Sequence, residues 1–310
     1  MRFNHTMGAI ILGALGLTLT QCDSLESPLS EDNRFVVESY HQVGKQLGNV
    51  RFTRAAGLEK KYSSDEQGII GADVKVFLLS EDGSREIEFR YREIPDRPGV
   101  YEPISSDPML ELRSYELQIS HPDASEIITA TTFAPGLFEI VRPGLDEVVY
   151  QQDPQFELGV TRSTFPGRQT IFEFSVESLD PKIENLTPLY FDFIDPESDL
   201  ADGLTEEEIL RDYVVIESQP VNEGNYNVLS DNTIDVRLPW FAIAFFGPLK
   251  FSASALDENL YDFFRSQNVQ QGGSTLSPGE IPNAITRIKG ATGIFGAYSR
   301  VTQETFVARQ

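Results

Sequence analysis

The stretch Ile87-Glu88-Phe89-Arg90-Tyr91-Arg92 alternates strictly between apolar and charged residues. Successive side chains of a β-strand point to opposite faces, so this pattern predicts a strand whose three apolar side chains share one face. The turn signal Glu81-Asp82-Gly83-Ser84 stands just before it, and the apolar-rich run Ala72–Leu79 precedes that turn. Together the three segments predict a β-hairpin.

Similar short runs flank this hairpin at Phe35–Tyr40, Tyr115–Ile119 and Glu126–Phe133. Several short strands at this spacing, separated by turn residues, are typical of a β-sandwich of about 100 residues. We therefore predict an all-β protein whose first folded domain is a sandwich over residues 34–135, with Pro135-Gly136 as the boundary.

Residues 136–310 are predicted to form a second β-rich domain with one or two short helices. Thr205–Asp212 predicts a helix, because Thr205 can cap it and Glu208 can close a capping box. Asp257–Gln267 predicts another, with its apolar residues on one face. The predicted strands are Phe156–Val160, Ile171–Val176, Tyr190–Ile194, Val214–Ile216, Ile234–Leu238, Gly293–Tyr298 and Thr305–Val307.

Cys22 is the only cysteine of the 310 residues. It follows a polar start that carries Arg2 and the apolar run Met7–Leu19, the pattern of a secretory signal peptide. The apolar run is shorter than the roughly 20 residues that a membrane-spanning helix needs. A cysteine at the cleavage site resembles the lipobox of bacterial lipoproteins. We therefore expect a signal peptide over residues 1–21 and lipid attachment at Cys22; the alternative is an ordinary signal peptide followed by an unrelated cysteine.

Residues 22–33 contain Ser, Pro and acidic residues with few apolar ones, a composition that cannot bury enough surface to fold. We expect them to form a flexible tether. The formal net charge of −23 makes nucleic acid an unsuitable partner, because phosphate would be repelled.

The sequence supplies little for catalysis. It has no HExxH motif, no GxSxG elbow and no phosphate-binding Gly-Lys loop. His41 and His121, the only histidines after the leader, are interpreted as structural. We assign no catalytic residue, no metal site and no cofactor. A hydrolase that uses two carboxylates remains an alternative, since such pairs are set by distance in space and no pair can be named from the sequence.

An acidic loop runs from Asp192 to Asp202 and has oxygen ligands at several alternate positions, as calcium loops do. Pro196 interrupts it and the EF-hand spacing is absent, so a solvated loop is the favoured interpretation over calcium binding. A second notable segment, Leu238–Phe251, contains Trp240, the only tryptophan. It is interpreted as buried core, or, if partly exposed, as a surface for a partner.

Six stretches resemble the lipoprotein family of Bacteroidota type that is catalogued as domain of unknown function 4249. They are Phe35–Tyr40, Val50–Arg54, Gly71–Val76, Tyr261–Phe264, Pro282–Ile285 and Lys289–Tyr298. The resemblance implies an outer-membrane or surface lipoprotein with an immunoglobulin- or transthyretin-like N-terminal part. Members often stand beside TonB-dependent outer-membrane receptors, which implies an accessory role in uptake. It implies no catalytic residues. The glycines of the last stretch are interpreted as turns and close strand packing.

From these observations we expect a non-enzymatic protein that is anchored to the outer membrane through lipid, on its periplasmic or its exposed face. Its expected role is to bind a ligand, or to assist a TonB-dependent β-barrel receptor. A structural or adhesive surface protein is the alternative, and a carboxylate-dependent hydrolase is a third.

Overall fold

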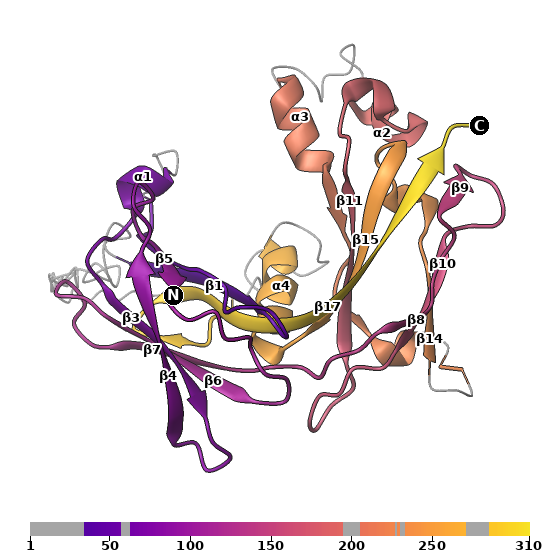
Figure 1. Cartoon of the computed structure of the whole chain (residues 1–310). Helices are drawn as coiled ribbons and strands as arrows, with labels where there is room; N and C mark the ends of the chain where they lie inside the picture. The colour runs from indigo at the N-terminus through magenta and orange to yellow at the C-terminus, as the bar shows by residue number, and fades with distance from the viewer. Residues whose placement is uncertain (1–33, 57–62, 195–204, 227, 230–232, 271–284) are drawn as a thin grey trace, which may run out of the picture. The chain divides into compact units, whose positions relative to one another are not determined.

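A computed structural model describes residues 34–56, 63–194, 205–226, 228–229, 233–270 and 285–310 (Figure 1). Strands account for 48% and helices for 13% of the structure, so the predicted all-β class is confirmed. Helices are nevertheless more frequent than the one or two expected. They are α1 (Ser64–Gln67), α2 (Pro188–Ile194), α3 (Glu206–Tyr213) and α4 (Glu258–Gln270), with the 3-10 helices η2 (Ile183–Asn185), η3 (Glu223–Asn225) and η4 (Trp240–Ala242).

The N-terminal part is a two-layered sandwich in which one strand serves both layers. Its strands are β1 (Phe35–Gln42), β2 (Val50–Arg54), β3 (Asp73–Leu79), β4 (Arg85–Glu93), β5 (Val100–Pro103), β6 (Ser114–Ser120), β7 (Ile128–Phe133) and β16 (Ile288–Lys289). The predicted hairpin is β3–β4, with Val76 opposite Phe89. The first half of β4 pairs with β3 and its last three residues pair with β5, so β4 passes from one layer to the other.

Within the alternating stretch Ile87–Arg92, Phe89 and Tyr91 belong to the core of this sandwich, whereas Ile87 is exposed. Ile87 lies near the start of β4, where the strand extends beyond the core. The same core also contains residues from the far end of the chain, Phe295 and Ala297. The first sandwich is therefore completed by residues outside 34–135. The whole stretch Glu31–Gln310 forms a single unit by its contacts, and the domain boundary at residue 135 stays a prediction.

The C-terminal part has two facing sheets. Its strands are β8 (Ile140–Arg142), β9 (Glu147–Val149), β10 (Glu157–Thr161), β11 (Ile171–Ser178), β12 (Val215–Glu217), β13 (Val221–Asn222), β14 (Thr233–Arg237), β15 (Gly247–Leu256) and β17 (Thr292–Ala308). The small sheet has the order β14-β10-β8. It packs on the inner face of β11 and β15 through a second apolar core that includes Phe172, Phe251 and Val236.

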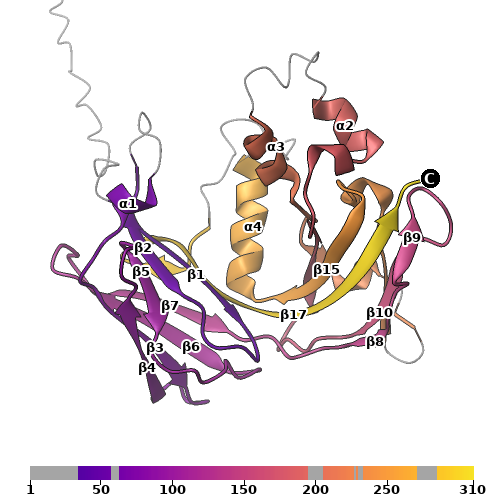
Figure 2. The same ribbon diagram turned by 45° about the horizontal axis from the view of Figure 1, so that its top comes forward.

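Strand β17 joins the two parts (Figure 1). Its first half pairs in parallel with β1, and its second half pairs antiparallel with β15. Within the described residues one sheet of 14 strands results, in the order β12-β11-β15-β17-β1-β2-β5-β4-β3-β6-β7-β16, with β13 beside β11 and β9 beside β17. Helix α4 lies against β17, with Leu260 buried between them (Figure 2).

Two of the predicted helices are confirmed, and one predicted strand is wrong. Thr205 caps α3 and forms the expected capping box with Glu208, and α4 covers Asp257–Gln267 except for its capping residue. Tyr190–Ile194, predicted as a strand, belongs to helix α2. Pro188 occupies the first helical position, where its missing N–H costs nothing, and the Tyr190 and Phe191 amides bond to the Thr187 carbonyl. These local bonds outweigh the β-propensity of the aromatic run.

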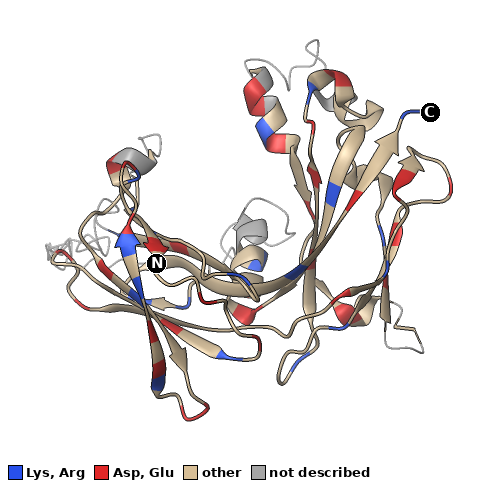
Figure 3. Cartoon of the chain, viewed as in Figure 1, with Lys and Arg blue, Asp and Glu red and all other residues tan. Residues whose placement is uncertain are grey.

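Charged residues are distributed along the strands and helices of both parts (Figure 3). Some of their ion pairs join side chains of neighbouring strands at the surface, such as Arg92 with Glu102 and Arg237 with Glu157. Exposed pairs of this kind contribute little to stability. The stability of the fold therefore comes mainly from the two apolar cores and from the pairing of the shared strand β17.

Gly293 gives a test of the β1–β17 junction. Its φ is +108°, and a Cβ built there would lie 2.0 Å from the Val37 carbonyl oxygen of β1. We expect Gly293→Ala to lower the free energy of unfolding by about 3 kcal/mol or more, because both the backbone conformation and the strand pairing are disturbed. Gly83→Ala is the matched control, since Gly83 has a φ of +82° with open space around it and should lose only about 1 kcal/mol. Equal losses in urea unfolding would contradict the steric argument.

Candidate functional site

Several predicted features fall outside the described residues. These are the signal peptide, Cys22, the tether over 22–33 and the acidic positions Asp195–Asp202. Lipid attachment and the nature of the acidic loop therefore stay predictions. Within the described part of the chain, no three His, Cys, Asp or Glu side chains gather as a metal site requires. No helix among these residues has both the length and the apolar character to cross a membrane.

His41 lies in the interior of the sandwich. The Gly48 amide donates a hydrogen bond to Nδ1 at 2.9 Å, so the proton of the neutral ring is on Nε2, which lies 2.8 Å from the Ser39 hydroxyl. That hydroxyl donates in turn to the Asn49 carbonyl. Burial lowers the pKa of His41 to about 3. A neutral imidazole with both nitrogens engaged ties β1 to the following loop, which is a structural role.

Asp257, at the start of α4, is a buried acid with three hydrogen bonds. The Leu260 amide donates to its Oδ1 at 2.7 Å, and the Ala297 amide of β17 donates to its Oδ2 at 3.0 Å. The Thr132 hydroxyl of β7 donates to the same Oδ2. One carboxyl group therefore caps a helix and joins two strands that are distant in sequence.

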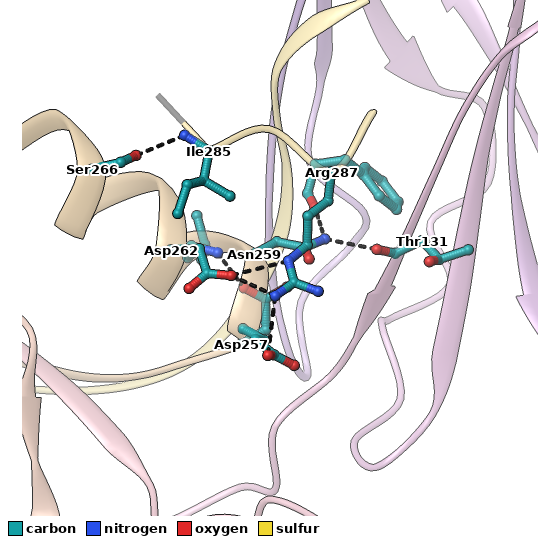
Figure 4. A network of polar contacts seen from close by, with 10 residues as sticks. Thr131, Asp257, Asn259, Asp262, Ser266, Ile285 and Arg287 are labelled. Atoms are coloured by element: carbon teal, nitrogen blue, oxygen red, sulfur yellow. Dashed lines mark hydrogen bonds and ion pairs between the residues drawn. The ribbon is translucent and has the colours of Figure 1, made fainter. Parts of the chain in front are cut away.

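Asn259 and Arg287 extend this junction (Figure 4). The Asn259 side-chain amide donates to the carbonyls of Thr131, at 2.7 Å, and Phe295, at 2.8 Å. Arg287 donates to Asp262 and Glu258 of α4. A cavity of about 320 Å³ opens beside these groups, lined by Thr131, Phe133, Phe165, Asp257, Asn259 and Arg287 among others. Asn259 is bonded to the backbone of β7 and β17, and Arg287 is bonded to acids of α4. These bonds position α4 between the two parts of the protein.

Burial raises the pKa of Asp257 to about 7, an effect larger than the opposing one of its three hydrogen bonds. Glu173 on β11 shows the same behaviour. Burial, reinforced by the charge of Glu217, raises the pKa of Glu173 to about 6, and Arg300 opposes this at 3.8 Å. Glu173 and Glu217 lie on neighbouring strands, with Glu217 opposite Ser175. The two carboxylates therefore repel each other across neighbouring strands.

The Leu238–Phe251 segment divides between core and surface. Ile243 and Phe245 are buried, as the core interpretation predicts, whereas Phe241 on η4 is 66% exposed. Trp240 is half-buried and packs edge-on against Tyr150, with ring centroids 5.4 Å apart. The sequence alone could not show which of these aromatic residues faces solvent.

Phe241 is exposed, and so are Leu189 and Phe191 of the neighbouring helix α2. We call these three residues the α2–η4 surface. The Tyr190 hydroxyl donates to the Phe241 carbonyl at 2.6 Å, and the Thr187 amide and hydroxyl donate to the carbonyls of Ala244 and Ile243. These bonds hold α2 against η4, so that exposed apolar side chains from two elements occur on adjoining segments. Leu189 and Phe191 flank Tyr190 on either side of the helix, so each is a separate candidate contact for a partner.

The model of one family, described as "Domain of unknown function (DUF4249)", matches residues 23–304. The chain belongs to this family. The match confirms the family resemblance drawn from the six stretches. It begins directly after Cys22 and spans both parts of the structure.

Lys289–Tyr298 is the glycine-rich stretch among the six that resemble DUF4249, and the structure explains its glycines. Gly290 has a φ of +81° and lies between β16 and β17. Gly293 lies against the Val37 carbonyl, and a Cβ on Gly296 would come within 2.5 Å of Leu260 on α4. The glycines therefore serve a turn and close packing, as interpreted from the sequence.

No curated protein matches the chain. Two solved structures share 11% and 12% identity with it: trypsin-activated and elastase-activated alpha-2-macroglobulin from Escherichia coli. They cover 89% and 88% of this chain, which spans only 16% and 22% of theirs, with TM-scores of 0.22 and 0.23. Scores this low carry no argument about fold or function for this member of DUF4249.

Asp257 makes stability depend on pH in a predictable direction. The carboxyl keeps its proton up to about pH 7 in the folded state but loses it near pH 4 when unfolded. Stability from this group is therefore complete at low pH and falls as pH rises from 4 to 7, by at most about 1.4 kcal/mol per pH unit. Asp257→Asn should be less stable than wild type at pH 5, because an amide nitrogen faces at least one N–H donor.

The wild-type advantage over Asp257→Asn should then shrink between pH 5 and pH 7, as measured by urea unfolding. Asp262→Asn is the control, because it breaks the ion pair with Arg287 and leaves Asp257 in place. A constant difference between wild type and Asp257→Asn at every pH would contradict the assignment.

Proposed function

We propose that the protein is a lipid-anchored, non-enzymatic binding protein of the outer membrane that assists a TonB-dependent β-barrel receptor. The observation that carries the binding role is the α2–η4 surface, where Phe241, Leu189 and Phe191 are exposed on adjoining segments. Aromatic and large apolar side chains are the usual anchors of protein interfaces. The lipid anchor rests on Cys22 and on a family match that begins at the next residue.

Two buried groups with strongly shifted pKa values, His41 and Asp257, support binding over catalysis. His41 and Asp257 are both fully buried, and each has its polar atoms bonded to groups of this chain. A general acid or base must reach a substrate proton directly or through one water molecule. Internal bonds of this kind favour a role in holding strands and helix together.

The anchor is tested by mass spectrometry of the protein from membranes. We expect the mature chain to begin at Cys22 and to carry the mass of long acyl chains, since two or more such chains give stable membrane attachment. Cys22→Ala should leave the membrane fraction or keep its leader. An unmodified peptide that contains Cys22, or a mature start elsewhere, would overturn the anchor.

The receptor is tested by pull-down from detergent-solubilised outer membranes. Wild type should recover a β-barrel receptor, and the double variant Phe241→Ser/Leu189→Ser should recover at least about tenfold less, because two central contacts are lost. Ile104→Ser is the matched control, since Ile104 is 60% exposed but lies in the N-terminal part. Recovery of no receptor by wild type, together with binding to matrix or neighbouring cells, would instead support the adhesive alternative.

A further inference from the structure

A second hollow lies directly beneath η4, between the two sheets of the C-terminal part. It has a volume of about 240 Å³. Its floor comes from Phe174, Val176 and Phe251 of the large sheet, and its opposite wall from Val236 and Leu238 at the edge of the small sheet. All five side chains are at least 92% buried. This is an apolar interior, and of the three residues of the α2–η4 surface Phe241 alone lines it.

The sheet topology explains why space remains here. Among the described strands, the large sheet ends at β12 and the small sheet ends at β14, and these two edges do not pair. The sandwich is therefore open between β12 and β14, and no described strand between these two edges supplies side chains to fill the space. Pro239, Phe241 and Ala242 from the η4 region, Ile216 from β12 and Tyr226 after η3 surround the opening.

One polar group at this cavity is unused by the fold. Tyr226 packs edge-on against Phe174, with centroids 5.6 Å apart, and its hydroxyl makes no hydrogen bond within the described residues. Burial raises the pKa of Tyr226, so the hydroxyl remains a neutral donor and acceptor. Glu217 borders the cavity but is exposed, and because it pairs opposite Ser175 its carboxylate lies on the face of the sheet away from Phe174 and Val176. Arg237 is held by Glu157 at 3.0 Å.

We propose that this cavity binds a compact ring-containing molecule that carries one hydrogen-bonding group and no charge. The aromatic side chains favour a ring, and the free Tyr226 hydroxyl favours one polar substituent. The apolar, buried lining disfavours a charged ligand, because Arg237 is already paired with Glu157 and a buried charge without a partner is costly. A cavity of about 150 Å³ accepts benzene in another protein, so the volume here fits a single substituted ring.

Three probes of matched size test the proposal with the full chain: benzyl alcohol, benzylamine and benzoate. Binding is followed by the melting temperature and by the fluorescence of Trp240, the single tryptophan, which neighbours Phe241. At about ten times Kd, benzyl alcohol should raise the melting temperature by roughly 2–4 °C. Benzylamine and benzoate, which are charged at neutral pH, should each bind at least tenfold more weakly.

Two variants locate the binding. Val236→Phe places an extra ring inside the cavity and should abolish the probe response. Val215→Phe makes the same change on β12 outside the cavity lining, where Val215 is 38% exposed, and should leave binding unchanged. If Val236→Phe does not fold, Tyr226→Phe keeps the ring and removes only the hydroxyl. It should weaken benzyl alcohol binding about three- to tenfold.

The proposal is overturned if none of the probes changes either signal. It is also overturned if Val236→Phe folds and binds as wild type does, or if either charged probe binds as tightly as benzyl alcohol. This proposal names the class of ligand for the binding role proposed above. It rests on that proposed function only for the statement that ligand binding serves uptake. Receptor recovery and acylation are measured separately, so failure of one proposal is distinguishable from failure of the other.

Discussion

The structure depends on the parallel pairing of β1 with β17. Parallel neighbours need a crossover connection between them, and here the crossover comprises almost the whole chain, from Gln42 to Thr292. The same strand then continues into the C-terminal sheet beside β15. Phe295 therefore belongs to the first core and Val307 to the second. One strand fixes the register of both parts, so neither part can shift along it independently.

A buried polar junction secures this arrangement where β7, α4 and β17 meet. Asp257 accepts hydrogen bonds from all three elements, and Asn259 bridges the backbones of the two strands. Gly296 leaves room for Leu260, so that α4 can approach β17 closely enough for these bonds. Polar groups buried with complete sets of partners contribute directional specificity that an apolar contact lacks. The family-specific run at Lys289–Tyr298 thus has a packing explanation.

Local signals in the sequence predicted local structure well. The alternation at Ile87–Arg92 and the capping pair Thr205 and Glu208 each depend on neighbouring residues, and both are confirmed. Features set by distant contacts were not predictable. The aromatic run Tyr190–Ile194 favoured a strand, but Pro188 and bonds from Thr187 to the 243–244 segment made it a helix. The α2–η4 surface, the carboxylates Glu173 and Glu217 and the cavity under η4 arise from segments that meet only in the folded chain.

The late position of β17 also bears on the order of events during synthesis. Strand β1 is synthesised long before its parallel partner β17. Until β17 follows, one edge of β1 is open, and open strand edges invite pairing with other chains. Because contacts between sequence-distant strands form slowly, the N-terminal sandwich stays incomplete until residues 292–298 pair with β1 and close this edge.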